Sequence, residues 1–359
     1  MNIKTITCHD VYNAGASLQA YALSAYLRQQ GHHVQIIDYK PDYLSRHLSL
    51  TTVGNEKFNR PLIRQAYLLA KLPERLRAKY SLRKRRYDAF RTEFLPLTCR
   101  YNSVDELRAN PPQADIYFAG SDQIWNTMFP NGKDPAFYLD FAPKGSIKAS
   151  YAASFATEDV LDDWKPQMKD WLHALDYISV RESSGVRIAQ ELGIIGAVQV
   201  LDPVFLLDAS TWRNMASERP SYPYLLVYDF DGNKQIAQEA KRLAAQHKLK
   251  IVTLQKFPYA DRCIRDAGPR EFLSLVDGAS FVLSNSFHAT AFSLIFQRPF
   301  MVYDRCENIN TRMRDLMVTA GLSHRSSADA PIDWAAVQMR LGKEIAASKA
   351  YIDSVLQGR

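Results

Sequence analysis

Residues 3–39 read IKTITCHDVYNAGASLQAYALSAYLRQQGHHVQIIDY, and this stretch decides the fold. Its two ends, 3–8 and 34–39, are short apolar runs of the kind that form buried strands, and residues 18–30 between them have the apolar spacing of a helix. Ser17 is the predicted N-cap of that helix. A strand, a helix and a second strand make a βαβ unit, which predicts a parallel sheet.

The same alternation of strands and helices recurs along the 359 residues, which are too many for one domain of about 150. We therefore predict an α/β protein with two Rossmann-like domains that face a cleft. The first domain is placed at 1–205 and the second at 212–332, with an extended link over 202–210. An amphipathic helix within 333–359 is expected to pack back on the first domain.

A basic helical insertion interrupts the alternation at about 57–95. Two helices are predicted, over 62–72 and 76–94, with a break at Pro73. Between residues 57 and 91 there are twelve Lys or Arg and two acids, so this segment's charge of +10 exceeds the +7 of the whole chain. Such a segment can dock on anionic lipid, or it can be a solvated helical face with no partner. We expect no nucleic acid, because no recognised nucleic-acid fold accompanies the charge.

Composition places the chain among soluble globular proteins, with 47% hydrophobic and 23% charged residues. No run approaches the roughly 18 apolar residues of a membrane span, and the start of the sequence shows no signal-peptide pattern. The four cysteines stand singly, without metal-ligand spacing, so we predict reduced thiols and no metal site. The expected location is the cytoplasm, with peripheral attachment to the inner face of the cell membrane through residues 57–91.

Polar groups stand where predicted strands end, and open α/β sheets bind ligands in such crevices. The strand 281–284 is followed by Asn285-Ser286-Phe287-His288, which places there an imidazole able to move a proton near neutral pH. The alternative for His288 is a core or capping role. Small residues from Asn13 to Ser17 precede a helix and offer backbone N–H groups to an anion, although a simple turn and cap explains them equally.

Two further strand ends carry charge. Gly120-Ser121-Asp122-Gln123 follows a strand and is backed by Trp125, an arrangement that suits a sugar ring or a core anchor. Asp122 can serve as a base, as a hydroxyl-binding group or as a cap. Arg181 presents a planar fork for a carboxylate or phosphate, and an internal pair with Glu182 or Asp202 is its structural alternative.

Together these motifs resemble the polysaccharide pyruvyl transferase family. The resemblance rests on Thr7-x-His9 and on the blocks 13–23, 120–126, 179–182, 201–206 and 284–290, in the family's order. It implies the two-Rossmann architecture of the glycosyltransferase-B enzymes. It also implies transfer of pyruvate from phosphoenolpyruvate to a pair of sugar hydroxyls, as a ketal, during assembly of a bacterial surface polysaccharide. No cofactor is expected besides this donor, and the acceptor is expected to be a lipid-linked oligosaccharide.

For this reaction we predict His288 as the acid that protonates the donor and Asp122 as the base or hydroxyl-binding group. Better-characterised members have Arg-Leu-His at the second-domain site, whereas Ser286 and Phe287 precede His288 here. Either Arg181 or Arg312 replaces the missing cation, or the donor differs from phosphoenolpyruvate. The complete set of expected substrate-binding residues is Asn13, Gly15, Ser17, Gln19, Ser121, Gln123, Trp125, Arg181, Asn285, Ser286 and Arg312.

Two other functions stay open on the sequence. A sugar-nucleotide glycosyltransferase would use the same architecture and hold its nucleotide in the second domain. A non-catalytic carbohydrate-binding or assembly protein would explain the absent Arg before Phe287.

Overall fold

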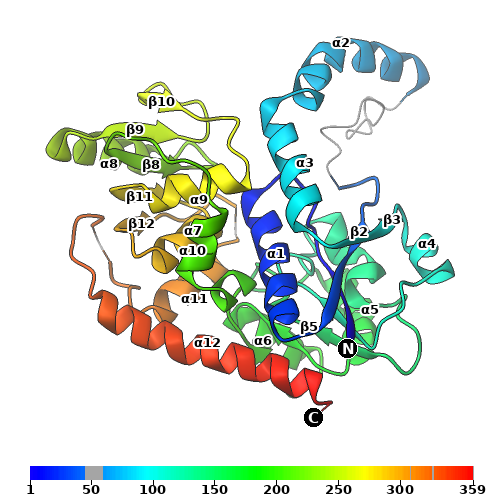
Figure 1. Cartoon of the computed structure of the whole chain (residues 1–359). Helices are drawn as coiled ribbons and strands as arrows, with labels where there is room; N and C mark the ends of the chain where they lie inside the picture. Colours follow the sequence, from blue (N-terminus) through cyan, green and yellow to red (C-terminus); the bar gives the residue numbers. More distant parts are fainter. Residues whose placement is uncertain (45–59, 308, 326, 359) are drawn as a thin grey trace.

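Two parallel sheets lie side by side in the computed structural model, which describes residues 1–44, 60–307, 309–325 and 327–358 (Figure 1). The strand order is β3-β2-β1-β4-β5 in the first sheet and β10-β9-β8-β11-β12 in the second, so both follow the same crossover scheme. This is the Rossmann order, with a switch point between the first and fourth strands of each sheet. The predicted class, two Rossmann-like domains facing a cleft, is confirmed.

The strands of the first sheet are β1 (Asn2–Ile6), β2 (His33–Tyr39), β3 (Leu97–Tyr101), β4 (Ile116–Ala119) and β5 (Ile147–Ser150). Those of the second sheet are β8 (Tyr224–Tyr228), β9 (Lys250–Thr253), β10 (Arg262–Cys263), β11 (Phe281–Ser284) and β12 (Phe300–Val302). A short pair, β6 (Ser179–Val180) and β7 (Val198–Gln199), lies beyond β5.

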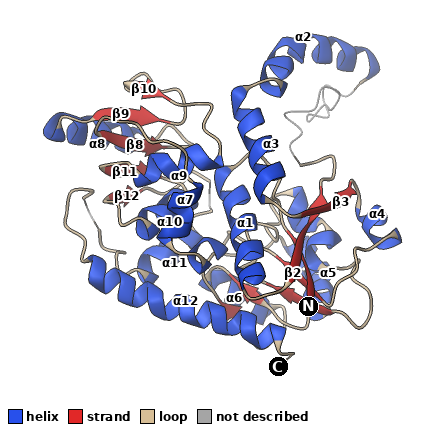
Figure 2. Cartoon of the chain, viewed as in Figure 1, coloured by secondary structure: helices blue, strands red, loops and turns tan. Residues whose placement is uncertain are grey.

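Helices cover the strands of both sheets (Figure 2). In the first half of the chain they are α1 (Ala14–Gln29), α2 (Pro61–Lys79), α3 (Leu82–Phe94), α4 (Val104–Ala109), α5 (Lys165–His173) and α6 (Ser183–Glu191). The second half contributes α7 (Ala209–Met215), α8 (Lys234–His247), α9 (Pro269–Asp277), α10 (Phe287–Ile295), α11 (Thr311–Thr319) and α12 (Trp334–Leu356). Among the described residues, no helix has the length and apolar character that crossing a membrane requires.

Helix α1 begins earlier than its sequence predicts. Asn13, not Ser17, is the N-cap, and its side-chain oxygen accepts a hydrogen bond from the Ala16 N–H at 3.2 Å. Ser17 therefore lies inside the helix and is buried. The earlier start is favoured because Asn is as good a cap as Ser, and it leaves the small residues that follow it free to form the first turn.

The basic insertion also differs from the prediction. Helix α2 runs through Pro73 and ends at Lys79, and the break comes where Ser81 caps α3 by accepting from the Lys84 N–H at 3.1 Å. Proline removes one N–H from the helix, but a new helix needs a capping group, and Ser81 provides it. The first residues of the predicted basic segment, 57–59, lie outside the described residues.

The predicted extended link over 202–210 is instead folded. Asp202 caps a 3₁₀ helix (Pro203–Leu206) by accepting from the Val204 N–H at 3.1 Å, and α7 begins at Ala209. Because all four residues of the 3₁₀ helix are buried, their apolar side chains form part of the core. Pro203 masks the turn in the helical periodicity, so the sequence alone predicts an extended link.

Helix α12 spans both lobes (Figure 1). Ser348 interrupts its apolar stripe, yet this side chain is buried and accepts a hydrogen bond from the Leu201 N–H at 2.9 Å. Three residues on, the Tyr351 hydroxyl donates to the Ser150 carbonyl at the end of β5 at 2.8 Å. The polar break in the stripe is therefore the point at which the helix is fastened to the first lobe.

Replacing Ser348 with Ala should lower the free energy of unfolding by about 1–3 kcal/mol, because the buried Leu201 N–H would lose its acceptor. Ser354→Ala is the control, since that hydroxyl bonds only within its own helix; it should change stability by less than about 0.5 kcal/mol. Urea denaturation measures both. Equal effects would show that Ser348 does not fasten the helix.

Candidate active site

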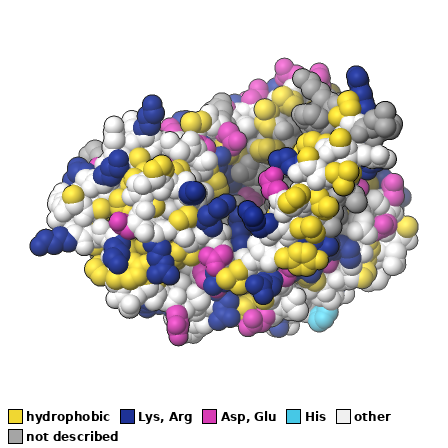
Figure 3. Space-filling model, turned by 90° about the horizontal axis from the view of Figure 1, so that it is seen from above, with side chains coloured by type: hydrophobic (Ala, Val, Ile, Leu, Met, Phe, Trp, Pro, Cys, Tyr) yellow, Lys and Arg dark blue, Asp and Glu magenta, His cyan; other side chains and the backbone are white. Residues whose placement is uncertain are grey.

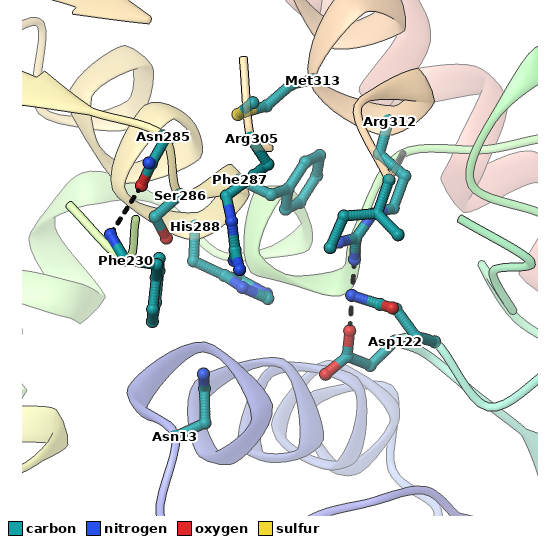
Figure 4. A pocket seen from close by; sticks show the side chains of 12 residues that line it. Asn13, Asp122, Phe230, Asn285, Ser286, Phe287, His288, Arg305, Arg312 and Met313 are labelled. Atoms are coloured by element: carbon teal, nitrogen blue, oxygen red, sulfur yellow. Dashed lines mark hydrogen bonds and ion pairs between the residues drawn. The ribbon is translucent and has the colours of Figure 1, made fainter. Parts of the chain in front are cut away.

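A pocket with about 590 Å³ of space, partly open to solvent, lies where the carboxyl ends of β4, β8 and β11 meet the start of α1 (Figure 4). Both sheets therefore present their switch points to it, as expected for ligand sites in open α/β folds. Its lining residues are Asn13, Asp122, Gln123, Phe230, Asn285, Ser286, Phe287, His288, Arg305, Ile309, Arg312 and Met313.

His288 stands in the first turn of α10, which Ser286 caps by accepting from the Ala289 N–H at 3.4 Å. The ring lies directly against α1 of the other lobe. A Cβ atom placed on Gly15 would sit 1.9 Å from His288 Nδ1, closer than any side chain allows. Gly15 is therefore required for the close approach of the two lobes at the imidazole. The sequence predicts it as a binding residue for another reason, contact of its backbone with an anion.

Asp202 orients the other side of the ring. Its Oδ2 lies 3.6 Å from His288 Nε2 and also accepts from Arg181 Nη1, while Oδ1 accepts from the backbone of the 3₁₀ helix. Burial alone would raise the pKa of Asp202, but His288 and Arg181 outweigh it and hold the pKa well below its usual range. The low pKa of the buried Asp202 carboxylate therefore depends on its neighbours His288 and Arg181.

Two guanidiniums meet at Asp122. Its Oδ1 lies 3.1 Å from Arg181 Nη2 and 3.4 Å from Arg312 Nη1. Phe287 is stacked by both cations, with Arg181 Cζ 4.6 Å and Arg312 Cζ 5.6 Å from the ring centroid. Burial raises the pKa of Asp122, yet Arg181, His288 and Arg312 lower it overall, so the carboxylate is ionised. Burial and the like charge of Arg181 lower the pKa of Arg312 to about 10.

Among the described residues, five Arg or His side chains bury a nitrogen that has no hydrogen-bond partner. Arg91 Nε and Arg298 Nε lie elsewhere, whereas Arg181 Nε, Arg312 Nε and His288 Nε2 lie at the pocket or directly behind its wall. An unmade hydrogen bond of this kind costs about 1–3 kcal/mol, and more for charged groups. The concentration of such nitrogens at one place points to a polar or anionic ligand that would satisfy those it can reach.

The other expected residues divide into two groups. Asn13, Asp122, Gln123, Asn285, Ser286, His288 and Arg312 all line the pocket. Gln123 meets Arg312: with the amide oxygen turned toward the guanidinium, it accepts from Nη2 at 2.6 Å. Asn285 accepts from the Phe230 N–H at 3.0 Å and donates to Asp229 at 2.8 Å, so its amide also fixes the loop after β8.

Trp125 corrects a prediction, because it cannot frame a sugar. Its side chain is fully buried, stacks on Tyr138 and donates from Nε1 to the Phe137 carbonyl at 3.0 Å. The core-anchor alternative holds for this residue. The loop after β4 turns at Asp122, which has a left-handed φ of 73°, and this turn directs the carboxylate to the pocket and the indole to the core.

Ser17, Gln19 and Ser121 lie behind the pocket and do not line it. Gln19 Nε2 donates to Thr7 Oγ1 at 2.9 Å, and its Oε1 accepts from the Ser121 N–H at 3.1 Å. The Ser121 hydroxyl donates to the Ala152 carbonyl at 2.7 Å. These buried side chains connect α1 to the loop after β4. They therefore stabilise the pocket from behind and do not contact a ligand in it.

Arg181 likewise does not line the pocket. Its guanidinium is buried behind Phe287 and its two terminal nitrogens bond to Asp202 and Asp122. The internal-pair alternative therefore describes this side chain. Its direct role is to fix Asp122 and Asp202, and it adds positive charge behind the pocket wall.

Five lining residues were not predicted as site residues: Phe230, Phe287, Arg305, Ile309 and Met313. Phe230 follows β8 as Asp122 follows β4, so the rule of strand ends could have found it. Arg305 Cζ lies 4.7 Å from the Phe230 ring centroid, and its Nε pairs with Asp231 at 3.1 Å. The loop that carries Arg305 and Ile309 has no local pattern, and only the tertiary fold brings it here.

The sequence profile described as polysaccharide pyruvyl transferase matches residues 13–307. The chain belongs to the polysaccharide pyruvyl transferase family. The matched range contains the pocket's contributions from both sheets, and Ile309, Arg312 and Met313 follow directly after it. No curated protein matches the sequence.

Solved structures similar to this family member include three carbohydrate-active proteins. The E. coli heptosyltransferase WaaC with ADP-2-deoxy-2-fluoro heptose is 14% identical, with 86% of this chain and 91% of that chain covered and a TM-score of 0.39. The spinosyn rhamnosyltransferase SpnG is 13% identical, covering 99% and 100%, with a TM-score of 0.41. UDP-GlcNAc 2-epimerase from Neisseria meningitidis bound to UDP-GlcNAc is 11% identical, covering 99% and 94%, with a TM-score of 0.46.

The contact between Gly15 and His288 is testable by coupling two substitutions. Gly15→Ala should cost about 1–3 kcal/mol of stability through overpacking, and His288→Ala in the same chain should relieve most of that cost. Urea denaturation of the two single variants and the double variant measures the coupling. Gly342→Ala, in an open position of α12, is the matched control and should not destabilise. Additive effects would contradict the packing of His288 on α1.

The charge of Asp202 predicts a pH dependence. Its pKa is depressed in the folded state, so its contribution to stability is present above about pH 4 and is lost as the pH falls through the lower folded value. Asp202→Asn should lower stability at neutral pH by about 3–5 kcal/mol, because Arg181 loses its buried partner. The loss of stability on acidification should be shallower in the variant. Unfolding followed from neutral to acidic pH tests this, and parallel curves would contradict it.

Proposed function

We propose that the protein transfers pyruvate from phosphoenolpyruvate to two hydroxyls of one sugar, forming a ketal, in the biosynthesis of a bacterial surface polysaccharide. Membership of the family supports a transferase. The observation that carries the donor assignment is that two pocket-lining side chains, Arg312 and His288, each keep a buried nitrogen without a hydrogen-bond partner among the described residues. A small donor with both a carboxylate and a phosphate suits a pocket with this excess of hydrogen-bond donors.

The proposed donor site lies between α11 and the start of α1. Arg312 supplies the cation that is absent before His288, and Arg305 supplies a second one on the same wall. Asn13 and Ser286 are the N-caps of α1 and α10, so the positive ends of both helix dipoles face this region. Together these groups would bind the carboxylate and the phosphate.

His288 is proposed as the acid. It gives a proton to the methylene carbon of the donor, which becomes a methyl group and leaves the adjacent carbon electrophilic. One sugar hydroxyl then bonds to that carbon and passes its proton to Asp122, whose lowered pKa keeps it ionised. The bond from that carbon to the phosphate oxygen breaks, and phosphate leaves with the electron pair. The second hydroxyl then closes the ketal and passes its proton to His288, which the first step left neutral.

The sugar acceptor is proposed to lie against Phe230. This ring lines the pocket, whereas the predicted Trp125 is buried. An aromatic face beside Asn285, in a pocket that Gln123 also lines, provides the combination of apolar surface and amide groups that suits a sugar ring and its hydroxyls. The acceptor is proposed to be carried on a lipid, as argued further below.

Turnover with phosphoenolpyruvate and a panel of nitrophenyl sugars or lipid-linked oligosaccharides tests the proposal, with phosphate release and product mass as readouts. His288→Asn should reduce kcat about 10²–10⁴-fold with donor binding retained. Arg312→Gln should raise the KM for the donor. Arg314→Gln, an exposed residue of the same helix, is the matched control and should behave as the wild type.

Two outcomes would overturn the proposal. Turnover or calorimetric binding with nucleotide sugars, and none with phosphoenolpyruvate, would favour the glycosyltransferase alternative. Binding of sugars with no turnover of either donor would favour a non-catalytic role. Unchanged kcat in a folded His288→Asn variant would remove this residue from the mechanism.

A further inference from the structure

Helix α2 stands away from both sheets, at the end of an arm formed with α3 (Figure 1). Although it is a helix of a globular protein, it leaves large apolar side chains exposed. Leu69, Leu72, Leu76 and Tyr80 are 70%, 36%, 37% and 68% exposed. Their spacing of three, four and four residues places them on one side of the helix, so they form a single stripe. We call these four residues the α2 stripe.

Cations flank the α2 stripe. Arg77 and Lys79 belong to the last turn of α2, and Arg85 is exposed one turn into α3. Over residues 60–94 the sequence has eleven Lys or Arg against three acids, and two of those acids already pair with Lys71 and Lys84. An exposed apolar stripe bordered by an excess of Lys and Arg over acids is the pattern of a helix that lies in the interface of an anionic membrane.

The base of the arm is fixed beside the pocket. Tyr87 and Phe90 bury α3 against the body, and Arg86 pairs with Asp266 at 3.0 Å and with Glu271 at 3.1 Å in the second lobe. Arg83 Nη2 donates at 2.8 Å to the carbonyl of Tyr12, the residue before the α1 cap. The arm is therefore held by both lobes and touches the loop that lines the pocket.

The face seen from above has Lys and Arg side chains gathered around a hollow at its centre (Figure 3). With 19 residues, α2 is long enough to span roughly 28 Å of surface. Because α2 lies on this upper side of the molecule, a membrane bound by the arm would lie near the hollowed, basic face.

We propose that α2 docks the protein on anionic lipid membranes by inserting the α2 stripe into the lipid interface, with Arg77, Lys79 and Arg85 on the headgroups. Docking would deliver a lipid-linked acceptor to the pocket, and this second statement rests on the proposed function. A membrane is favoured over nucleic acid because leucines, not stacking aromatics, dominate the exposed side of α2.

Sedimentation of the full-length protein with vesicles tests the docking in the absence of donor and sugar. The vesicles are phosphatidylcholine alone, or phosphatidylcholine with phosphatidylglycerol, at low and high salt. We expect partition onto the anionic vesicles that weakens with salt. Arg77→Gln with Lys79→Gln should reduce it about fivefold per cation, and Leu69→Ser with Leu76→Ser about tenfold per leucine.

Met339→Ser with Lys343→Gln, on the exposed side of α12, is the matched control and should bind as the wild type does. Because the substituted residues are exposed, all variants should keep the wild-type circular dichroism melt. Wild-type partition of the leucine variant, equal binding to both vesicle types, or capture of RNA in place of vesicles would each overturn the proposal.

The test also separates docking from the proposed function. Loss of vesicle binding with unchanged turnover on soluble nitrophenyl sugars would leave the reaction in place. Docking without turnover on any acceptor would support the membrane-docking proposal and contradict the proposed pyruvyl transfer.

Discussion

The buried carboxylate of Asp202 contacts the guanidinium of Arg181 and faces the imidazole of His288, and no part of its side chain is exposed to solvent. Removing such charges from water costs several kcal/mol per ion, which only close and well-directed partners can offset. Each of the three groups is therefore constrained by the other two. Arg181 follows β6 in the first lobe, His288 stands in α10 of the second lobe, and Asp202 belongs to the segment between them. This cluster therefore connects the two lobes.

The packing around this cluster follows from it. His288 can reach Asp202 only by lying against α1, and Gly15 is the residue that leaves room for it. Arg181 and Arg312 both contact the ring of Phe287. Both guanidiniums also pair with the carboxylate of Asp122. The carboxylate between them reduces the repulsion, while burial and the remaining like charge lower the pKa of Arg312.

The same arrangement explains how stability and function compete in the cleft. Nitrogens of Arg181, Arg312 and His288 stay without hydrogen-bond partners among the described residues, which is unfavourable in the free protein. Unfavourable features of this kind cluster at ligand-binding sites, where the bound ligand compensates for the stability that the free protein lacks. The buried and hydrogen-bonded side chains of Trp125, Ser121 and Gln19 stabilise the core directly behind the pocket.

The sequence by itself determined the parallel α/β class, the two similar halves and the strand ends that carry Asp122, Asn285 and His288, because strand and helix periodicity and the residues after each strand are local properties. It could not show that Asp122 faces the pocket while Trp125 faces the core, because the directions of these side chains depend on the left-handed backbone conformation of one residue. It also could not show that Arg181 pairs internally, that Arg305 joins the pocket or that α2 continues through Pro73. These features depend on contacts between residues far apart in the chain and on which caps compete locally, and only the folded structure decides them.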